Sequence, residues 1–383
     1  MSVKRKIYYI ANARMPTEKA HGIQLAKMCE AFVEHGIELE LVVPDRKTSP
    51  QTIKDFYGLR VSIPVRKLPV IDWYGSSRIG FFIGSLSFAI GYFCYLLFKR
   101  IRGQHFIIYM TDIDQFSFFL IPFAGVPYVA EIHDAKAKRR AFVLLFRFAS
   151  GIITINRIIK KELCATFGIE PQKVIVHPNG IDMSMFSHIP DQDSARNALQ
   201  LPSDKTIIVY VGKFYEWKGL DVAIEAARVV DQNVDFYFVG GTQEELVHAS
   251  GIREIPNNVH CVGHRTFTEI PIWLASADFC LVLGTKRNDY SYLHTSPMKF
   301  FEYMASNRPV IASRTPANTE IVSDAEVLMY EPDDVKDLAE KIHYALEHRK
   351  EMVERAERAY KKVNDFSWEK RAGSIIQFIN SAI

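Results

Sequence analysis

The stretch IIVYVGKFYEWKGLD, residues 207–221, contains the start of a strand–loop–helix unit. Its first five residues are all β-branched or aromatic and stop at Gly212, which predicts a buried strand ending there. A loop with Lys213 and Lys218 follows, and a helix is expected to begin near Gly219. A short strand followed at once by a helix is the repeating unit of a parallel α/β sheet.

The same alternation of strand and helix patterns runs along the whole chain. In the first half the expected strands are residues 6–11, 38–43, 106–110, 126–131, 151–155 and 174–176. In the second half they are residues 207–212, 235–240, 259–263, 278–283 and 308–313. The polar segment 187–205 reads as a linker with a short helix. Since 383 residues exceed what one ordinary core organises, two doubly wound α/β domains are predicted.

Charge is distributed unevenly between the two halves. Lys and Arg exceed Asp and Glu by 10 in residues 1–183, whereas the acids exceed the bases by 7 in the remainder. A basic half favours an anionic partner such as a membrane or an acidic acceptor, or it is only an uneven solvated surface. No nucleic-acid-binding motif accompanies the charge. The five cysteines show no metal or disulfide spacing, which fits a reducing, cytoplasmic setting.

Residues 79–98, IGFFIGSLSFAIGYFCYLLF, carry no charge. About 20 apolar residues equal the length of a membrane span. A span here would nevertheless place the strands of one domain on opposite sides of a bilayer. We therefore expect a buried or membrane-surface helix.

The loop after the strand at 207–212 has the character of an anion site. Strand ends that point at helix starts are where open α/β sheets bind ligands. The ammonium groups of Lys213 and Lys218 can converge there on a diphosphate, although any lysine pair taken alone is more often solvated surface.

A second candidate is HTSPMKFFEYMASNRPVIAS, residues 294–313. Ser296 is expected to cap a helix with Pro297 and Met298 in its first turn, so that free backbone N–H groups attract an anion. Glu302 lies five residues after Pro297, among aromatic neighbours. Its carboxylate can accept hydrogen bonds from vicinal hydroxyls such as those of a ribose, the alternative being a partly exposed helix glutamate.

These two stretches, with HPNGID at 177–182 and EIHD at 131–134, resemble the retaining family 4 (group 1) glycosyltransferases over essentially the whole chain. The resemblance implies the GT-B fold: two facing Rossmann-like domains and a C-terminal helix that crosses back to the first. We accordingly expect an acceptor domain at 1–185 together with the helix 366–383. The nucleotide-sugar domain is expected at 186–365.

The resemblance also implies roles for single residues. Lys213 and Lys218 would hold the donor diphosphate, with Lys213 standing where the family more often has Arg. Glu302 would bind the nucleotide ribose. Gly22 would let the backbone approach the diphosphate, and His133 would reach the donor sugar near the reacting carbon. The remaining donor-site positions would be Gly212, the backbone around Gly263 and His264, His294, Ser296, Pro297 and Met298.

His294 departs from the family pattern. The family has an acid at this position that contacts hydroxyls of the transferred sugar, so the identity of the donor sugar is left open. Asp289 in the preceding loop is one substitute for that acid.

The sequence thus predicts a retaining glycosyltransferase that moves a sugar from a nucleoside-diphosphate donor to a glycan or lipid-linked acceptor. No paired acids follow the relevant strand ends, so neither a metal nor a cofactor is expected. The setting is expected to be cytoplasmic, at the inner face of the membrane, with peripheral contact through 79–98 and no nucleic-acid partner. Two alternatives stay open: a GT-B-fold sugar-nucleotide epimerase, and a non-catalytic sugar-nucleotide-binding protein.

Overall fold

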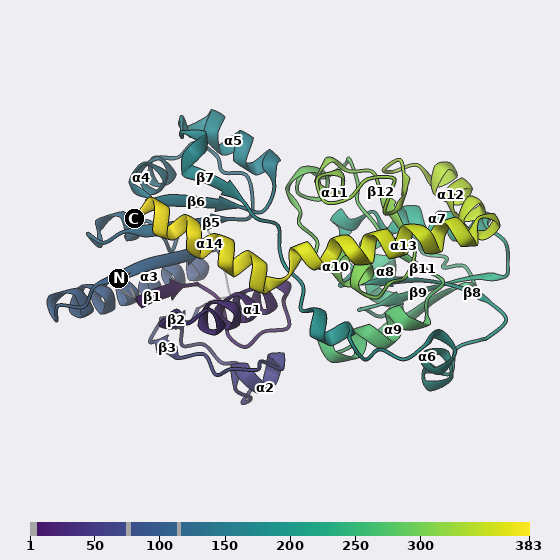
Figure 1. Ribbon diagram of the computed structural model, residues 1–383, viewed down its shortest axis with the longest axis horizontal. Helices are drawn as coiled ribbons and strands as arrows, with labels where there is room; N and C mark the ends of the chain where they lie inside the picture. The colour runs from purple at the N-terminus through teal and green to yellow at the C-terminus, as the bar shows by residue number, and fades with distance from the viewer. Residues whose placement is uncertain (1–5, 74–77, 113–115) are drawn as a thin grey trace. The chain divides into compact units, whose positions relative to one another are not determined.

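The computed structural model describes residues 6–73, 78–112 and 116–383 (Figure 1). The chain divides into two compact units. Unit 1 comprises Met1–Asn179 and Trp368–Ile383, and unit 2 comprises Gly180–Ser367. The division differs from the predicted one by a few residues: 180–185 and 366–367 belong to unit 2.

The described part of unit 1 contains a seven-stranded parallel sheet in the order β3-β2-β1-β4-β5-β6-β7. Its strands are β1 (Lys6–Ile10), β2 (Leu39–Pro44), β3 (Val65–Leu68), β4 (Phe106–Thr111), β5 (Tyr128–Ile132), β6 (Gly151–Thr154) and β7 (Val174–Val176). Its helices are α1 (Ala20–Glu34), α2 (Ile53–Tyr57), α3 (Arg78–Ile101), α4 (Arg140–Phe148), α5 (Arg157–Phe167) and α14 (Trp368–Ala382).

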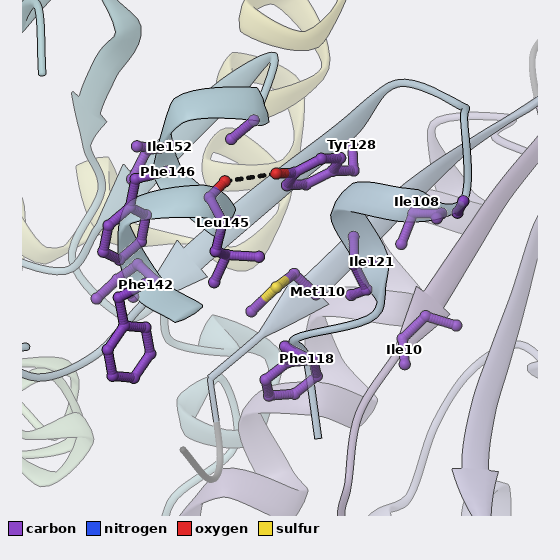
Figure 2. Packing of buried hydrophobic residues seen from close by; sticks show 14 of the residues in the cluster. Ile10, Ile108, Met110, Phe118, Ile121, Tyr128, Phe142, Leu145, Phe146 and Ile152 are labelled. Carbon is purple, nitrogen blue, oxygen red and sulfur yellow. Dashed lines mark hydrogen bonds between the residues drawn. The ribbon is translucent and has the colours of Figure 1, made fainter. Parts of the chain in front are cut away.

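Both faces of this sheet are covered by helices. On one face, strand residues such as Ile10, Ile108 and Met110 pack against α3, α4 and α5. Figure 2 shows these three residues together with α4 residues of the same cluster. Helix α4 contributes Phe142 and Phe146 to that cluster. On the other face α14 runs beside α1 (Figure 1). Because both faces are buried, the strands read as continuous apolar runs rather than as alternating ones.

Unit 2 has a six-stranded parallel sheet in the order β10-β9-β8-β11-β12-β13. Its strands are β8 (Thr206–Val211), β9 (Val234–Val239), β10 (Val259–Gly263), β11 (Phe279–Val282), β12 (Val310–Ser313) and β13 (Leu328–Tyr330). Its helices are α6 (Gln192–Leu199), α7 (Leu220–Val229), α8 (Gln243–Ser250), α9 (Ile270–Ser276), α10 (Met298–Ala305), α11 (Pro316–Thr319), α12 (Val335–Glu347) and α13 (Arg349–Val363).

Alternate residues of β8 point to opposite faces of that sheet. Ile207, Val209 and Val211 pack in a cluster with α9, α10 and part of α13. Ile208 and Tyr210 pack in a second cluster with α7, α8 and α12. Since α10 and Tyr210 belong to opposite faces, they meet only above the carboxyl end of the strand.

Two strands were not predicted, β3 and β13. In β3 the central residues Arg66 and Lys67 are exposed at the edge of the sheet, so no apolar run marks it. In β13 only three residues pair with β12. Short edge strands carry too little hydrophobic pattern to be recognised from sequence.

The apolar segment 79–98 lies within α3. Phe88, Ala89, Tyr92 and Leu96 are buried in the core of unit 1. Side chains on the other side of the helix are exposed: Ile79, Phe82, Ile90, Leu97, Phe98 and Ile101. By length and composition α3 also qualifies as a membrane-spanning helix, as does the core helix of many soluble proteins. The helix thus packs one face on the sheet and exposes the other, and the expected contact of its exposed face with a membrane stays a prediction.

Candidate functional site

Lys213 and Lys218 lie on the loop that follows β8, at the carboxyl edge of the unit 2 sheet. β8 pairs with β9 on one side and with β11 on the other, so the strand order reverses between β8 and β11. Open α/β sheets bind ligands at the carboxyl ends of strands next to such a reversal. The loops after β8 and β11 therefore form the candidate site.

Gly212 begins this loop with a φ of +139°, which side-chain-bearing residues rarely adopt. Its N–H donates to the carbonyl of Val239 at 2.8 Å. A Cβ atom at this position would lie 2.9 Å from Nζ of Lys299 and 3.6 Å from the hydroxyl of Tyr210. The absent side chain thus leaves room for a lysine ammonium directly beside the backbone.

Lys218 ends the short 3₁₀ turn η4 (Glu216–Lys218), immediately before α7. Its ammonium stands 3.8 Å from the centre of the Trp217 ring. Burial lowers the pKa of Lys218 from 10.5 to about 7. Because an anion nearby favours the charged form of an amine, a phosphate at this position would raise that pKa again. Lys213 is partly buried on the same loop.

Lys299, in the first turn of α10, was not predicted as a site residue. Its ammonium lies 4.0 Å from the centre of the Tyr210 ring. Burial lowers the pKa of Lys299 well below 10.5, and the charge of Lys218 lowers it further, while Glu302 acts in the opposite direction. Among the described residues Lys299 forms no salt bridge. The residue is recognisable in retrospect as the one cation inside the apolar run SPMKFFEYM.

Glu302 lies one turn further along α10 and is buried, with 8% of its surface exposed. Burial raises the pKa of its carboxyl from 4.5 to about 7, although Lys299 lowers it in part. The apolar neighbours Phe300, Phe301 and Tyr303 fix the helix against the sheet, and the Tyr303 hydroxyl accepts a hydrogen bond from the N–H of Val211 at 2.7 Å. The structure thus brings Glu302, Lys299 and Lys218 into electrostatic contact at the end of β8.

The loop after β11 is anchored at both ends. Arg287 forms a two-pronged ion pair with Asp221 of α7 at 2.8 and 2.9 Å and reaches Asp333 at 3.2 Å. Further on, residues Tyr290–His294 form one π-helical turn, η6, and the Tyr290 ring meets the Trp217 ring edge-on at 5.1 Å. His294, at the position where an acid was expected, is buried. Asp289 is exposed.

The start of α10 differs from the prediction. Pro297, and not Ser296, occupies the N-cap position, and no side chain caps the helix. Ser296 is buried one residue earlier, and Met298 is the first helical residue. Pro297 holds the extended backbone that a cap needs because its ring restricts φ, so the N-terminus of the helix forms without a hydroxyl cap.

His264 follows β10, on the far side of β9 from the lysine loop. Its ring is more than half exposed, and Nε2 lies 3.2 Å from Oε2 of Glu245. Gly263 before it has a φ of +83°. The role predicted for this backbone, docking of a base, stays a prediction.

In unit 1, His133 follows β5 and is tied to a buried acid. Its Nε2 lies 2.6 Å from Oε1 of Glu131, and the backbone N–H of His133 donates to Oδ1 of Asp112 at 2.9 Å. Burial alone would raise the pKa of Glu131, but Arg371 of α14, His133 and Tyr109 together lower it well below 4.5. This network fixes the orientation of the His133 ring. Glu131 is part of the EIHD motif that the sequence analysis singled out, whereas only folding brings Arg371 next to it.

Gly22 lies in the first turn of α1, also in unit 1. Its N–H donates to the carbonyl of Lys19 at 2.8 Å. A Cβ atom here would collide with the Tyr57 hydroxyl and with Thr17. A glycine is therefore required by packing, which accounts for this residue without a ligand.

Among the described residues, no group of three or more His, Cys, Asp or Glu side chains is placed to hold a metal ion.

Comparison with known proteins identifies the family to which both halves of the chain are similar. The family model described as "Glycosyl transferases group 1" matches residues 191–362, and the model described as "Glycosyltransferase Family 4" matches residues 22–185. An Escherichia coli (strain K12) protein, whose name assigns it to colanic acid biosynthesis as the glycosyl transferase WcaI, is 29% identical over 230 residues, 56% of this chain and 54% of its own length. The uncharacterized glycosyltransferase MJ1178 of Methanocaldococcus jannaschii is 26% identical over 262 residues, 64% of this chain and 66% of its own length. The chain thus spans between about half and just under two thirds of these relatives.

Solved structures extend the similarity over nearly the full chain. The sucrose-phosphate synthase of Thermosynechococcus elongatus superposes with a TM-score of 0.76 at 18% identity and covers 98% of both chains. The Anabaena protein Alr3699/HepE, solved in complex with UDP-glucose, gives a TM-score of 0.75 at 18% identity and covers 98% of this chain and 99% of its own. These likenesses show the two-domain α/β GT-B fold.

Proposed function

Because this chain belongs to the group 1, family 4 glycosyltransferases, we propose that it transfers a sugar from a nucleoside-diphosphate donor to a hydroxyl of a glycan or lipid-linked acceptor. The observation that carries the proposal is the half-buried ammonium of Lys218, set beside Lys299 and Glu302 where the strand order reverses. Buried amines with lowered pKa values are typical of functional sites because burial without an anion is unfavourable for the charged form. A diphosphate supplies that anion.

In the proposed reaction the bond between the anomeric carbon and the phosphate oxygen breaks, and its electron pair stays on the departing diphosphate. The acceptor oxygen forms the new glycosidic bond from the same face, and its proton passes to the departing phosphate. Lys213, Lys218 and the N-terminus of α10 stabilise the charge that grows on the leaving group. The configuration at the anomeric carbon is retained, and the reaction as written uses no metal ion.

Glu302 fits the ribose of the donor. A carboxylate accepts hydrogen bonds from two neighbouring hydroxyls. Burial raises the pKa of Glu302 to about 7, and hydrogen bonds from a ribose would lower it again because they stabilise the ionised form. His294 and the loop before it would then contact the transferred sugar, without the acid common in the family. His133 of unit 1 is proposed as a further contact to that sugar.

We assign the acceptor to unit 1 and place the enzyme at a membrane surface. The exposed apolar side of α3 is followed by basic residues, of which Arg102 lies over the Phe98 ring at 4.2 Å. Apolar side chains flanked by cations are the pattern of a peripheral membrane contact. Relatives named for colanic acid and amylovoran biosynthesis support a polysaccharide or glycolipid product at the cytoplasmic face.

The test starts from the donor because the acceptor is unidentified. A thermal-shift screen of nucleoside diphosphates and their sugars selects the tightest binder, since ligand binding stabilises the folded state by mass action. Release of nucleoside diphosphate from that donor is then measured with and without cell-envelope glycolipids. The proposal is supported if release of nucleoside diphosphate depends on the acceptor and the product has the same anomeric configuration, α or β, as the donor. A free epimerised sugar would instead identify an epimerase, and binding without any turnover a non-catalytic protein.

A further inference from the structure

One buried hydroxyl near the lysines has no hydrogen-bond partner among the described residues. The side chain of Tyr210, at the end of β8, is 1% exposed, and its hydroxyl makes no hydrogen bond to any residue that the structure describes. Leaving a buried hydroxyl unsatisfied costs on the order of 1–3 kcal/mol. Such a group is commonly explained by a ligand, an ion or a water that completes it.

A second feature points to the same place. Lys299 holds its ammonium 4.0 Å from the centre of the Tyr210 ring and forms no salt bridge to a described residue. The charged groups that act on it are Lys218, which repels it, and Glu302, which attracts it. Two half-buried cations close together are unfavourable unless an anion lies between them.

Gly212 lies next to both the Lys299 ammonium and the Tyr210 hydroxyl. The position of its missing Cβ is 2.9 Å from the ammonium of Lys299 and 3.6 Å from the hydroxyl of Tyr210. Any larger residue would occupy this position. The backbone here therefore leaves open the space in which an oxygen atom of a ligand can meet the ammonium and the hydroxyl together.

We propose that Lys299 and Tyr210 form a phosphate-binding contact behind Gly212, which adds a third lysine and a hydroxyl to the diphosphate site of the donor. The inference rests on the proposed function, because it assigns to the same ligand two side chains that the sequence did not indicate. Burial and the charge of Lys218 lower the pKa of Lys299 well below 10.5, and phosphate oxygens beside the ammonium would raise that pKa again.

Binding of three probes tests this contact: UDP, inorganic pyrophosphate and uridine. Lys299→Met keeps the length and apolar bulk of the side chain but removes the ammonium. It is expected to weaken UDP and pyrophosphate at least tenfold and to leave uridine unchanged. Lys336→Met, at an exposed position on α12 where 87% of the side chain is accessible, is the matched control and is expected to change none of the three.

Tyr210→Phe provides a second variant that does not depend on the first. Removing an unsatisfied buried hydroxyl is expected to raise the melting temperature of the ligand-free protein, and removing a phosphate contact is expected to weaken UDP. A higher melting temperature together with a lower UDP affinity would indicate a ligand contact, because loss of a purely structural hydroxyl would not weaken UDP selectively. A stabilised protein with unchanged UDP affinity would show that the hydroxyl contacts no ligand, which overturns the proposal for Tyr210.

Proton linkage gives an independent readout. Calorimetric titration with UDP at about pH 8, in two buffers with different ionisation enthalpies, measures the protons taken up on binding. Lys218 and Glu302 also titrate there, so the wild-type value includes them. Lys299→Met is expected to lower the uptake relative to the wild-type protein, because the variant lacks an amine whose pKa is lowered in the absence of phosphate.

The outcomes separate this inference from the proposed function. If Lys218→Ala weakens UDP and pyrophosphate while Lys299→Met behaves as Lys336→Met does, the contact behind Gly212 is wrong and the donor site stands. If neither Lys218→Ala nor Lys299→Met weakens either probe, or if the wild-type protein binds neither, the diphosphate site itself is wrong and the inference falls with it.

Discussion

Arg371 and Glu131 form a buried ion pair within unit 1, although 240 positions separate them in the sequence. Nη2 of Arg371 lies 2.8 Å from Oε1 of Glu131, and neither side chain is more than 2% exposed. Arg371 also donates to the carbonyl of Pro178 at 2.9 Å. The last helix, α14, is thus attached to the sheet of unit 1 by a charge–charge contact that also orients His133.

Arg371→Met is expected to destabilise unit 1 by about 3–5 kcal/mol, because it leaves the charge of Glu131 buried without a partner. Urea unfolding followed by a probe in unit 1 measures the loss. Lys161→Met, at an exposed position on α5, serves as the control. Adding Glu131→Gln to Arg371→Met should recover part of the loss, and failure to recover any would show that the charge is not the cause.

Glu302→Gln is expected to change the pH dependence of stability. The pKa of Glu302 rises to about 7 on folding, so the folded state binds more protons than the unfolded state between about pH 4.5 and 7. Wild-type stability therefore falls across that range, by about 3 kcal/mol from this group. Denaturation at about pH 5 and pH 8 should show equal stability at the lower pH and a more stable variant at the higher one. Equal stability of the two proteins at both values would contradict the raised pKa.

Lys218→Ala should lower turnover by roughly 100- to 1,000-fold if its ammonium stabilises the leaving diphosphate. Nucleoside diphosphate release under single-turnover conditions separates this effect from product release. Lys336→Ala provides the exposed-lysine control. Near wild-type turnover in Lys218→Ala would exclude the electrostatic mechanism proposed above.

Gly212→Ala should impair UDP binding as well as stability, since its Cβ would lie 2.9 Å from the Lys299 ammonium at a φ of +139°. Gly251→Ala is a matched control: Gly251 also has a positive φ, +72°, but nothing lies within 4 Å of its Cβ position. We expect about 1 kcal/mol of backbone strain from the control and no change in UDP affinity. Equal effects of the two variants on affinity would remove the argument for close approach at Gly212.

Membrane contact through α3 is tested by charge placed on its exposed side. Ile90→Glu and Leu97→Glu, at positions that are 50% and 41% exposed, should reduce co-sedimentation with vesicles of phosphatidylcholine and phosphatidylglycerol. Val353→Glu, at a 51% exposed position on α13, should not. If the wild-type protein does not sediment with such vesicles at low salt, α3 is not a membrane contact.

Much of the candidate site was predictable because its residues lie in two short stretches. Lys213, Lys218 and Glu302 follow strand patterns that were themselves recognisable, and parallel strands bring their carboxyl ends to one edge. Lys299 lies in the same stretch but was not predicted, because the sequence does not show that its side of the helix lies beside Lys218 and Glu302. The expected Ser296 cap was wrong because the helix begins one residue later, and element ends are the least predictable part of a fold.

The sequence by itself determined the alternation of strands and helices, the two α/β units and the family, since these depend on local periodicity and short motifs. Only the tertiary structure decided which distant groups meet: Arg371 with Glu131, and Lys299 with Tyr210 above Gly212. The physical reason is that desolvation and pairing of charges depend on three-dimensional distance. The distance along the chain between a lysine and another group does not show whether the two meet. Only folding places the lysine beside an aromatic ring or an acid.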